Sequence, residues 1–239
     1  MPDILAMILL AACYGFIAWR SLPHAVALFV FLLPAYQVRF SVFGLPTTAL
    51  EVMFLALTVV WAARRLRVSR ERPSWPWRAT TVTLLVAGAL AVMVSPDRWA
   101  GLGLYRAYVL EPVVLFCIFV DVVRSERSQR LVMMAMSATV VIVGLAAWLQ
   151  NFHLMPGVEP YASQIPARAT SIFAFPTAVG KYVAPICAFF LALVFVRRRN
   201  GSIPNESQAR VERGIRFLAL GTVILGLGAI IFSVSRGAL

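Results

Sequence analysis

Residues 131–158, LVMMAMSATVVIVGLAAWLQNFHLMPGV, contain no Asp, Glu, Lys or Arg. A helix on the surface of a soluble domain carries a polar face, so an uncharged run of this length argues against such a helix. A helix that crosses a bilayer needs about 17–25 predominantly apolar residues. Further uncharged runs occupy residues 79–96, 182–196 and 217–235, and residues 21–38 are uncharged unless His24 carries a proton. The spacing of the charges therefore predicts several transmembrane helices.

The composition leads to the same prediction. The 239 residues are 61% hydrophobic and 13% charged, and this charged fraction is about half that of a soluble domain. Lipid removes the need to bury so much apolar surface in one core. We expect an all-α fold, a polytopic transmembrane helical bundle that forms a single domain over residues 1–239. Its eight expected spans cover roughly residues 4–19, 23–38, 46–63, 79–95, 103–122, 131–150, 176–196 and 216–234.

The basic residues predict the orientation of the bundle. The net charge is +12, but the arginines stand in short clusters between apolar runs, so we expect no nucleic-acid partner. Sixteen of the 22 basic residues fall on one side of the predicted spans, which the positive-inside rule places in the cytoplasm. These are Arg20, Arg64, Arg65, Arg67, Arg70, Arg72, Arg78, Arg124, Arg127, Arg130, Arg197, Arg198, Arg199, Arg210, Arg213 and Arg216. The outer side holds Arg39, Arg98, Arg106, Arg168, Lys181 and Arg236.

Four of the outer basic residues are candidates for an anion site. Arg168 lies in the proline-rich connection 151–175, Lys181 lies in the following span, Arg106 begins the fifth span, and Arg236 follows the eighth. A guanidinium binds phosphate oxygens through paired hydrogen bonds, and the pyrophosphate of a lipid carrier is an anion found at this depth. The alternative is that each side chain reaches the headgroups and binds nothing specific.

Two acidic residues, Glu51 and Glu111, fall within expected spans. Charges there are costly and are functional candidates, either paired with a base, held neutral, or acting as a proton relay. Because Arg106 and Glu111 are five residues apart, an α-helix places them on different faces. We therefore expect any partner of Arg106 to come from another helix.

The motifs of soluble enzymes are absent from the sequence. It has no phosphate-binding glycine loop, no H-E-x-x-H and no nucleophile elbow. The three cysteines lie in apolar runs and form no C-x-x-C pair, and with two histidines we expect no metal site and no cofactor.

Three stretches resemble the O-antigen ligase and O-antigen polymerase family. Residues 168–180, RATSIFAFPTAVG, are similar to a segment in which an arginine precedes an aromatic-Asn/His-Pro-Asn-like turn and a membrane helix, although Thr177 stands where Asn is usual. Residues 232–239, FSVSRGAL, resemble the S-x-S-R-G-A that opens the family's core. Residues 97–112, DRWAGLGLYRAYVLEP, resemble its early helices. The resemblance covers the whole chain as the N-terminal part of a longer protein.

The resemblance implies a multi-pass glycosyltransferase of the bacterial inner membrane. Such enzymes take a glycan from an undecaprenyl-pyrophosphate carrier at the periplasmic face and pass it to lipid A core, another glycan or a protein. By matching position, Arg168 and Arg236 would bind the pyrophosphate. The catalytic base would lie beyond Leu239, so we expect this chain alone to be inactive. Its expected partners are the bilayer, a lipid-linked oligosaccharide donor and a glycan or lipid acceptor.

Two other functions remain open from the residues. The first is a transporter or flippase that uses Glu51, Glu111 and Lys181 along a polar path. The second is a non-catalytic membrane subunit that packs against a partner. Transporters often contain internal repeats, and we find none in this sequence.

Overall fold

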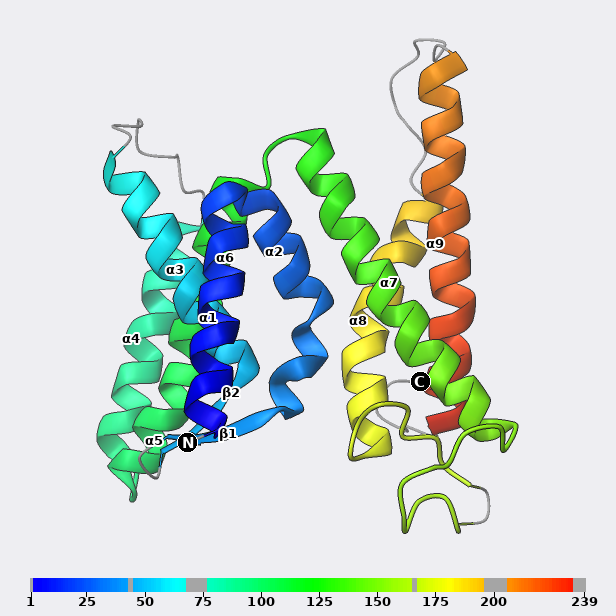
Figure 1. Cartoon of the computed structure of the whole chain (residues 1–239), viewed down its shortest axis with the longest axis horizontal. Coiled ribbons are helices and arrows are strands. Elements are labelled where there is room, and N and C mark those ends of the chain that lie inside the picture. The colour runs from blue at the N-terminus through cyan, green and yellow to red at the C-terminus, as the bar shows by residue number, and fades with distance from the viewer. Residues whose placement is uncertain (1, 43–44, 68–76, 165–166, 196–205, 234–239) are drawn as a thin grey trace. The chain divides into compact units, whose positions relative to one another are not determined.

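The structure is a computed structural model and describes residues 2–42, 45–67, 77–164, 167–195 and 206–233. The regular secondary structure of this part of the chain is helical apart from one two-stranded hairpin, and an irregular loop follows α7 (Figure 1). In chain order its elements are α1 (Pro2–Arg20), α2 (Leu22–Phe31), the 3-10 helix η1 (Leu33–Gln37), β1 (Arg39–Val42), β2 (Leu45–Thr48), α3 (Ala49–Arg67), α4 (Arg78–Val94), α5 (Arg98–Tyr105), the π-helical turn η2 (Arg106–Leu110), α6 (Glu111–Val122), α7 (Glu126–Asn151), α8 (Pro176–Phe195) and α9 (Glu206–Ser233). The chain forms two compact units, Met1–Val132 and Met133–Leu239.

Four helical segments of this described part are long and apolar enough to cross a bilayer. They are Arg98–Val122, Glu126–Asn151, Pro176–Phe195 and Arg213–Ser233. They overlap the last four expected spans, 103–122, 131–150, 176–196 and 216–234, and three of them begin three to five residues earlier than expected. They suggest a membrane-embedded protein. Ile4–Arg20, Leu22–Phe31 and Arg78–Val94 are apolar but shorter, so the full set of eight spans stays a prediction.

Two expected helices begin or end elsewhere than predicted. The span predicted over 23–38 is wrong as one helix, because α2 ends at Phe31 and a 3-10 helix follows. Pro34 supplies no backbone N–H and disfavours α-helical backbone in the residue before it, which explains the break. The span predicted to begin at 46 begins at Ala49, since residues 45–48 pair antiparallel with residues 39–42.

A capping box explains the start of α3. The Glu51 backbone N–H donates to Thr48 Oγ1 at 3.2 Å, and the Thr48 N–H donates to Glu51 Oε2 at 3.1 Å. This reciprocal pair satisfies two backbone donors that the first turn of a helix leaves without partners. The T-A-L-E sequence at 48–51 therefore sets the boundary between the hairpin and the helix.

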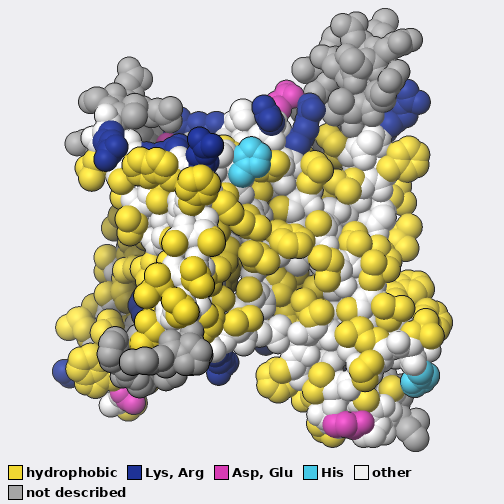
Figure 2. Space-filling model, viewed as in Figure 1, with side chains coloured by type: hydrophobic (Ala, Val, Ile, Leu, Met, Phe, Trp, Pro, Cys, Tyr) yellow, Lys and Arg dark blue, Asp and Glu magenta, His cyan; other side chains and the backbone are white. Residues whose placement is uncertain are grey.

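Unit 1 packs α1, α2, α3 and α6 around a small core that includes Tyr14, Val26, Phe29, Leu57 and Ile118. The Tyr14 hydroxyl donates to the Ala25 carbonyl at 2.8 Å, which ties α1 to α2. Arginine side chains gather at the end of this unit where α1 and α3 finish (Figure 2). This end carries residues that the sequence assigns to the cytoplasmic side.

Unit 2 packs most of α7 with α8 and α9 through small residues. A Cβ on Gly226 would meet Cys187 Sγ at 2.1 Å, and a Cβ on Gly228 would meet the Trp148 indole at 2.3 Å. Ser137 and Thr222 hydroxyls lie 2.6 Å apart and link α7 to α9 inside the unit. Small residues at helix crossings and interhelical hydroxyl bonds are typical of helix packing in membranes.

Candidate functional site

A buried glutamine holds the segment 168–173 in place. This segment begins the stretch 168–180, one of two stretches that we call family-like; the other is 232–239. Gln150 near the end of α7 is 8% exposed. Its Oε1 accepts from the Thr170 N–H at 3.0 Å and the Ser171 N–H at 2.7 Å, and its Nε2 donates to the Ser171 carbonyl at 3.0 Å. A fourth bond runs from Nε2 to the Pro156 carbonyl at 3.3 Å. One side chain thus satisfies backbone groups that would otherwise be buried without partners.

Ser171 completes this clamp. Its φ of 54° lies in the left-handed region, which is uncommon for a residue other than glycine. Its Oγ donates to the Val143 carbonyl on α7 at 2.6 Å, and the residue is 4% exposed. The tight turn is therefore fixed from both its backbone and its side chain.

Arg168 is half-buried and contacts the end of α9. Its backbone N–H donates to the Tyr161 carbonyl at 3.1 Å, and its Nε donates to the Ser233 carbonyl at 3.2 Å. The next residue repeats the contact, since the Ala169 N–H donates to the Phe232 carbonyl at 2.9 Å. Residues 168 and 169 are therefore joined by hydrogen bonds to Phe232 and Ser233, the two described residues of the stretch 232–239.

Arg168 also lines a pocket of about 340 Å³ within this unit. The pocket is formed by the end of α7 and the loop that follows it, and its lining includes Asn151 and His153 beside Arg168. His153 has a φ of 57°. The volume is in the range of small-ligand sites, and the arrangement offers a guanidinium, an amide and an imidazole at one opening.

The other predicted anion ligands are placed differently. Lys181 is exposed on α8, next to the fully buried Val179 and Val183, and it does not line the Arg168 pocket. Arg236 lies outside the described residues. It is three positions after Ser233 in the sequence.

Arg106 belongs to unit 1, where it lies between two carboxylates. Its Nη2 is 2.6 Å from Glu51 Oε1 and its Nε is 3.3 Å from Glu111 Oε1. The expectation that Arg106 and Glu111 lie on different faces is wrong, because residues 106–110 form a π-helical turn. A π-turn bonds residues five apart, so it aligns the two side chains that an α-helix would separate. The Glu51 pair confirms that a partner comes from another helix.

The clamp residues were missed by reasoning from the sequence. Gln150 and Ser171 are uncharged, whereas the predicted site was built from charged residues. The pocket residue His153 was not assigned a role, because it lies outside the family-like stretches. A signal existed for Gln150, because a lone amide at the end of a long uncharged run needs partners if it is buried. Its partners lie about 20 residues away, and nothing local in the sequence identifies them.

Within the described ranges, no three His, Cys, Asp or Glu side chains converge as they would at a metal site. Cys13, Cys117 and Cys187 are free thiols. No family model, no curated protein and no solved structure matches this chain.

Proposed function

We propose that this chain supplies the pyrophosphate-binding part of a membrane glycosyltransferase of the O-antigen ligase and polymerase type. The donor would be a glycan on an undecaprenyl-pyrophosphate carrier, used at the periplasmic face of a bacterial inner membrane. The observation that carries the proposal is the hydrogen bonding of Arg168 and Ala169 to the end of α9, where the second family-like stretch begins.

The chemistry of such a donor fits a fixed arginine. When the glycosidic bond breaks, the pyrophosphate leaving group gains negative charge. A guanidinium that is already positioned stabilises that charge without having to reorganise. Gln150 and Ser171 would act as positioning residues, because they hold the backbone from which Arg168 projects. The general base is assigned to no residue of this chain. Lys181 is proposed only as an outer-side cation that attracts the anionic donor. Arg106 is not given this role, because Glu51 and Glu111 already pair with it.

A direct binding measurement tests the proposal. The purified chain in neutral detergent is titrated with a polyprenyl pyrophosphate and with the matching monophosphate. Arg168→Gln should weaken pyrophosphate binding by about 10- to 100-fold, since a charge-assisted hydrogen bond contributes about 1.5–3 kcal/mol. Arg168→Lys retains the charge but not the paired hydrogen bonds of a guanidinium, so its affinity should lie between those of wild type and Arg168→Gln.

The matched control is Arg98→Gln, an exposed arginine at the start of α5 in the other unit. It should leave binding within about twofold, as expected of a change at an exposed residue away from the site. Equal binding by wild type and Arg168→Gln would overturn the proposal. In the full-length protein, unchanged surface glycan after substitution of Arg168 or Arg236 would remove both from the site.

A transporter is the second candidate, and one observation favours it. Glu51, Arg106 and Glu111 meet at a π-turn inside a segment long enough to cross a bilayer. Ionisable residues at such positions often form proton or ion pathways, and π-turns occur frequently at functional sites. Reconstituted vesicles with an internal pH dye test it. Proton flux that is the same with wild type and Glu111→Gln would exclude this role for the cluster.

A further inference from the structure

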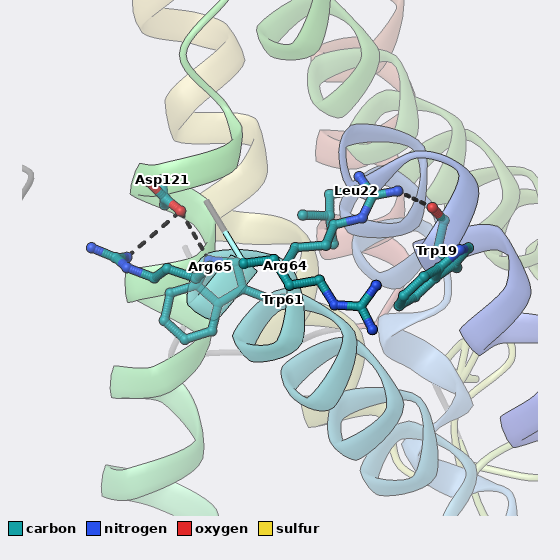
Figure 3. Close-up of a pocket in the computed structure, with 7 residues that line it drawn as sticks. Trp19, Leu22, Trp61, Arg64, Arg65 and Asp121 are labelled. Atoms are coloured by element: carbon teal, nitrogen blue, oxygen red, sulfur yellow. Dashed lines mark hydrogen bonds and ion pairs between the residues drawn. The ribbon is translucent and has the colours of Figure 1, made fainter. Parts of the chain in front are cut away.

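A second pocket, of about 410 Å³, lies in unit 1 at the end where its arginines gather (Figure 3). It is lined by the end of α1, the first residue of α2, the end of α3 and one side chain of α6. The lining residues are Trp19, Leu22, Trp61, Arg64, Arg65, Arg67 and Asp121. The pocket lies at the opposite end of α3 from Glu51, the partner of Arg106.

The acidic residue of this pocket is already neutralised. Asp121 Oδ1 is 2.8 Å from Arg124 Nη2, and its Oδ2 is 3.6 Å from Arg65 Nη1. The Trp61 indole N–H donates to the same carboxylate at 3.0 Å. Asp121 therefore positions Arg65 and Trp61 and leaves little negative charge to repel an anion.

The other two arginines of the pocket have no carboxylate partner among the residues that the structure describes. Arg64 donates to the Trp19 carbonyl at the end of α1, and its guanidinium lies 5.9 Å from the centre of the Trp19 ring. Arg67 lies 5.4 Å from the same ring. Stacking on tryptophan orients a guanidinium while its N–H groups stay free for another acceptor. Within the part of the chain that the structure describes, two positive charges in the pocket are thus positioned by an aromatic ring and have no carboxylate beside them.

An apolar stripe leads along α1 to this pocket. Leu5, Leu9, Phe16 and Trp19 are 61%, 55%, 63% and 45% exposed. Their spacing of three, four or seven residues places them on one face of the helix. At 1.5 Å per residue the stripe is about 21 Å long, more than the depth of one leaflet of the hydrocarbon core. A basic pocket that continues into an apolar stripe matches an amphiphile better than a free anion.

We propose that this pocket binds the phosphate headgroup of an anionic phospholipid, with an acyl chain along the exposed face of α1. Arg64 and Arg67 supply the donors for the phosphate oxygens, and Trp19 and Trp61 lie at the headgroup level that tryptophan favours. Basic pockets between membrane helices on the cytoplasmic side are suited to such lipids. The inference does not depend on the glycosyltransferase proposal, since it uses other residues in the other unit.

The test measures lipid binding to the full chain in neutral-detergent micelles. Phosphatidylglycerol brominated on its acyl chains quenches nearby tryptophans, and a titration gives its apparent dissociation constant. The salt concentration is about 1 M, where the Debye length is about 3 Å and general surface attraction is screened. Arg64→Gln combined with Arg67→Gln should weaken binding at least tenfold, and Trp19→Phe should remove part of the quenching.

Arg130→Gln is the matched control. Arg130 is also assigned to the cytoplasmic side, but it pairs with Glu126 at 3.0 Å and does not line the pocket. It should bind within twofold of wild type. Arg64 also bonds to the α1 backbone, so replacing it removes a contact between α1 and α3. Arg67→Gln is therefore measured alone as well, because Arg67 contacts α1 through the Trp19 ring and not through the backbone. That variant should bind the brominated lipid at least threefold more weakly than wild type, and its helix content measured by circular dichroism should be unchanged.

Three results would overturn the proposal. The first is equal weakening by Arg130→Gln and by the Arg67→Gln variant, which would mean unspecific charge attraction. The second is equal quenching by brominated phosphatidylcholine, which carries no net charge. The third is displacement of the brominated lipid by millimolar inorganic phosphate, which would identify the ligand as a free anion.

Discussion

Replacing Gln150 by leucine should release the segment that carries Arg168. The substitution keeps a similar size but leaves the N–H groups of Thr170 and Ser171 without their acceptor, in residues that are 0% and 4% exposed. Four hydrogen bonds are lost in total. Each contributes about 0.5–1.5 kcal/mol in soluble proteins, and about 0.6 kcal/mol on average between membrane helices. The local cost is then about 3 kcal/mol.

Hydrogen exchange measures this cost where it occurs. A loss of about 3 kcal/mol should speed exchange at the Thr170 and Ser171 amides on the order of a hundredfold, because each 1.4 kcal/mol is a factor of ten. Exchange in the middle of α7 should not change. Asn151→Leu is the control, since Asn151 is the next amide along the chain and is exposed. Unchanged exchange at both amides in Gln150→Leu would refute the reasoning that Gln150 holds this segment.

Two further experiments test the packing and the charges. Gly228→Ala should destabilise unit 2 by about 1–3 kcal/mol, because the new Cβ would meet the Trp148 indole. Gly221→Ala should be neutral or stabilising, since a Cβ there has nothing within 4 Å. Thermal unfolding compares the two variants, and equal effects would contradict the close approach of Gly228 to Trp148. Arg106→Gln and Glu51→Gln should be non-additive in a double-mutant cycle, with a coupling of about 0.5–1 kcal/mol, since the pair is partly exposed. Additive effects on the unfolding free energy would mean that the 2.6 Å contact contributes nothing to stability.

The long helices could be predicted because a bilayer imposes a requirement on composition. A run of uncharged residues such as 131–150 is readable without knowledge of its neighbours, and the structure has a helix there. The break after Phe31 was also signalled, by Pro34, but hydropathy averaged over the run conceals it. The capping box at Thr48 and Glu51 was a local signal for the start of α3 that the apolar pattern alone did not reveal.

The details of the two sites could not be predicted because they depend on geometry rather than composition. The alignment of Arg106 with Glu111 requires a π-turn, and an α-helical spacing rule gives the opposite result. The bonds from Gln150 to Thr170 and Ser171 join residues 20 and 21 positions apart through a loop whose path no periodicity describes. Arginines at the outer side were identifiable as candidates, but the contact of Arg168 with Ser233 was not.

In each unit, the basic residues predicted to face the cytoplasm and those predicted to face the outer side lie near opposite ends of one helix. In unit 1, Glu51 holds Arg106 near one end of α3 and Arg65 lies 14 residues further on, about 21 Å away along the axis. In unit 2, Ser233 holds Arg168 at the end of α9 and Arg216 lies 17 residues earlier, about 26 Å away. Distances of this size are comparable to the hydrocarbon thickness. The charge pattern is thus consistent within each unit taken by itself.

This separation lets the two proposals fail independently. A reporter fused within residues 151–164 that proved cytosolic would put the Arg168 pocket on the wrong side of the bilayer from a periplasmic donor. The glycosyltransferase proposal would then be lost. The pocket of Arg64 and Arg67 would still lie at a membrane interface, beside the apolar stripe of α1, and anionic phospholipids can occupy either leaflet. The prediction of lipid binding would stand unchanged, because the contacts proposed for it depend on depth and charge and not on which compartment the pocket faces.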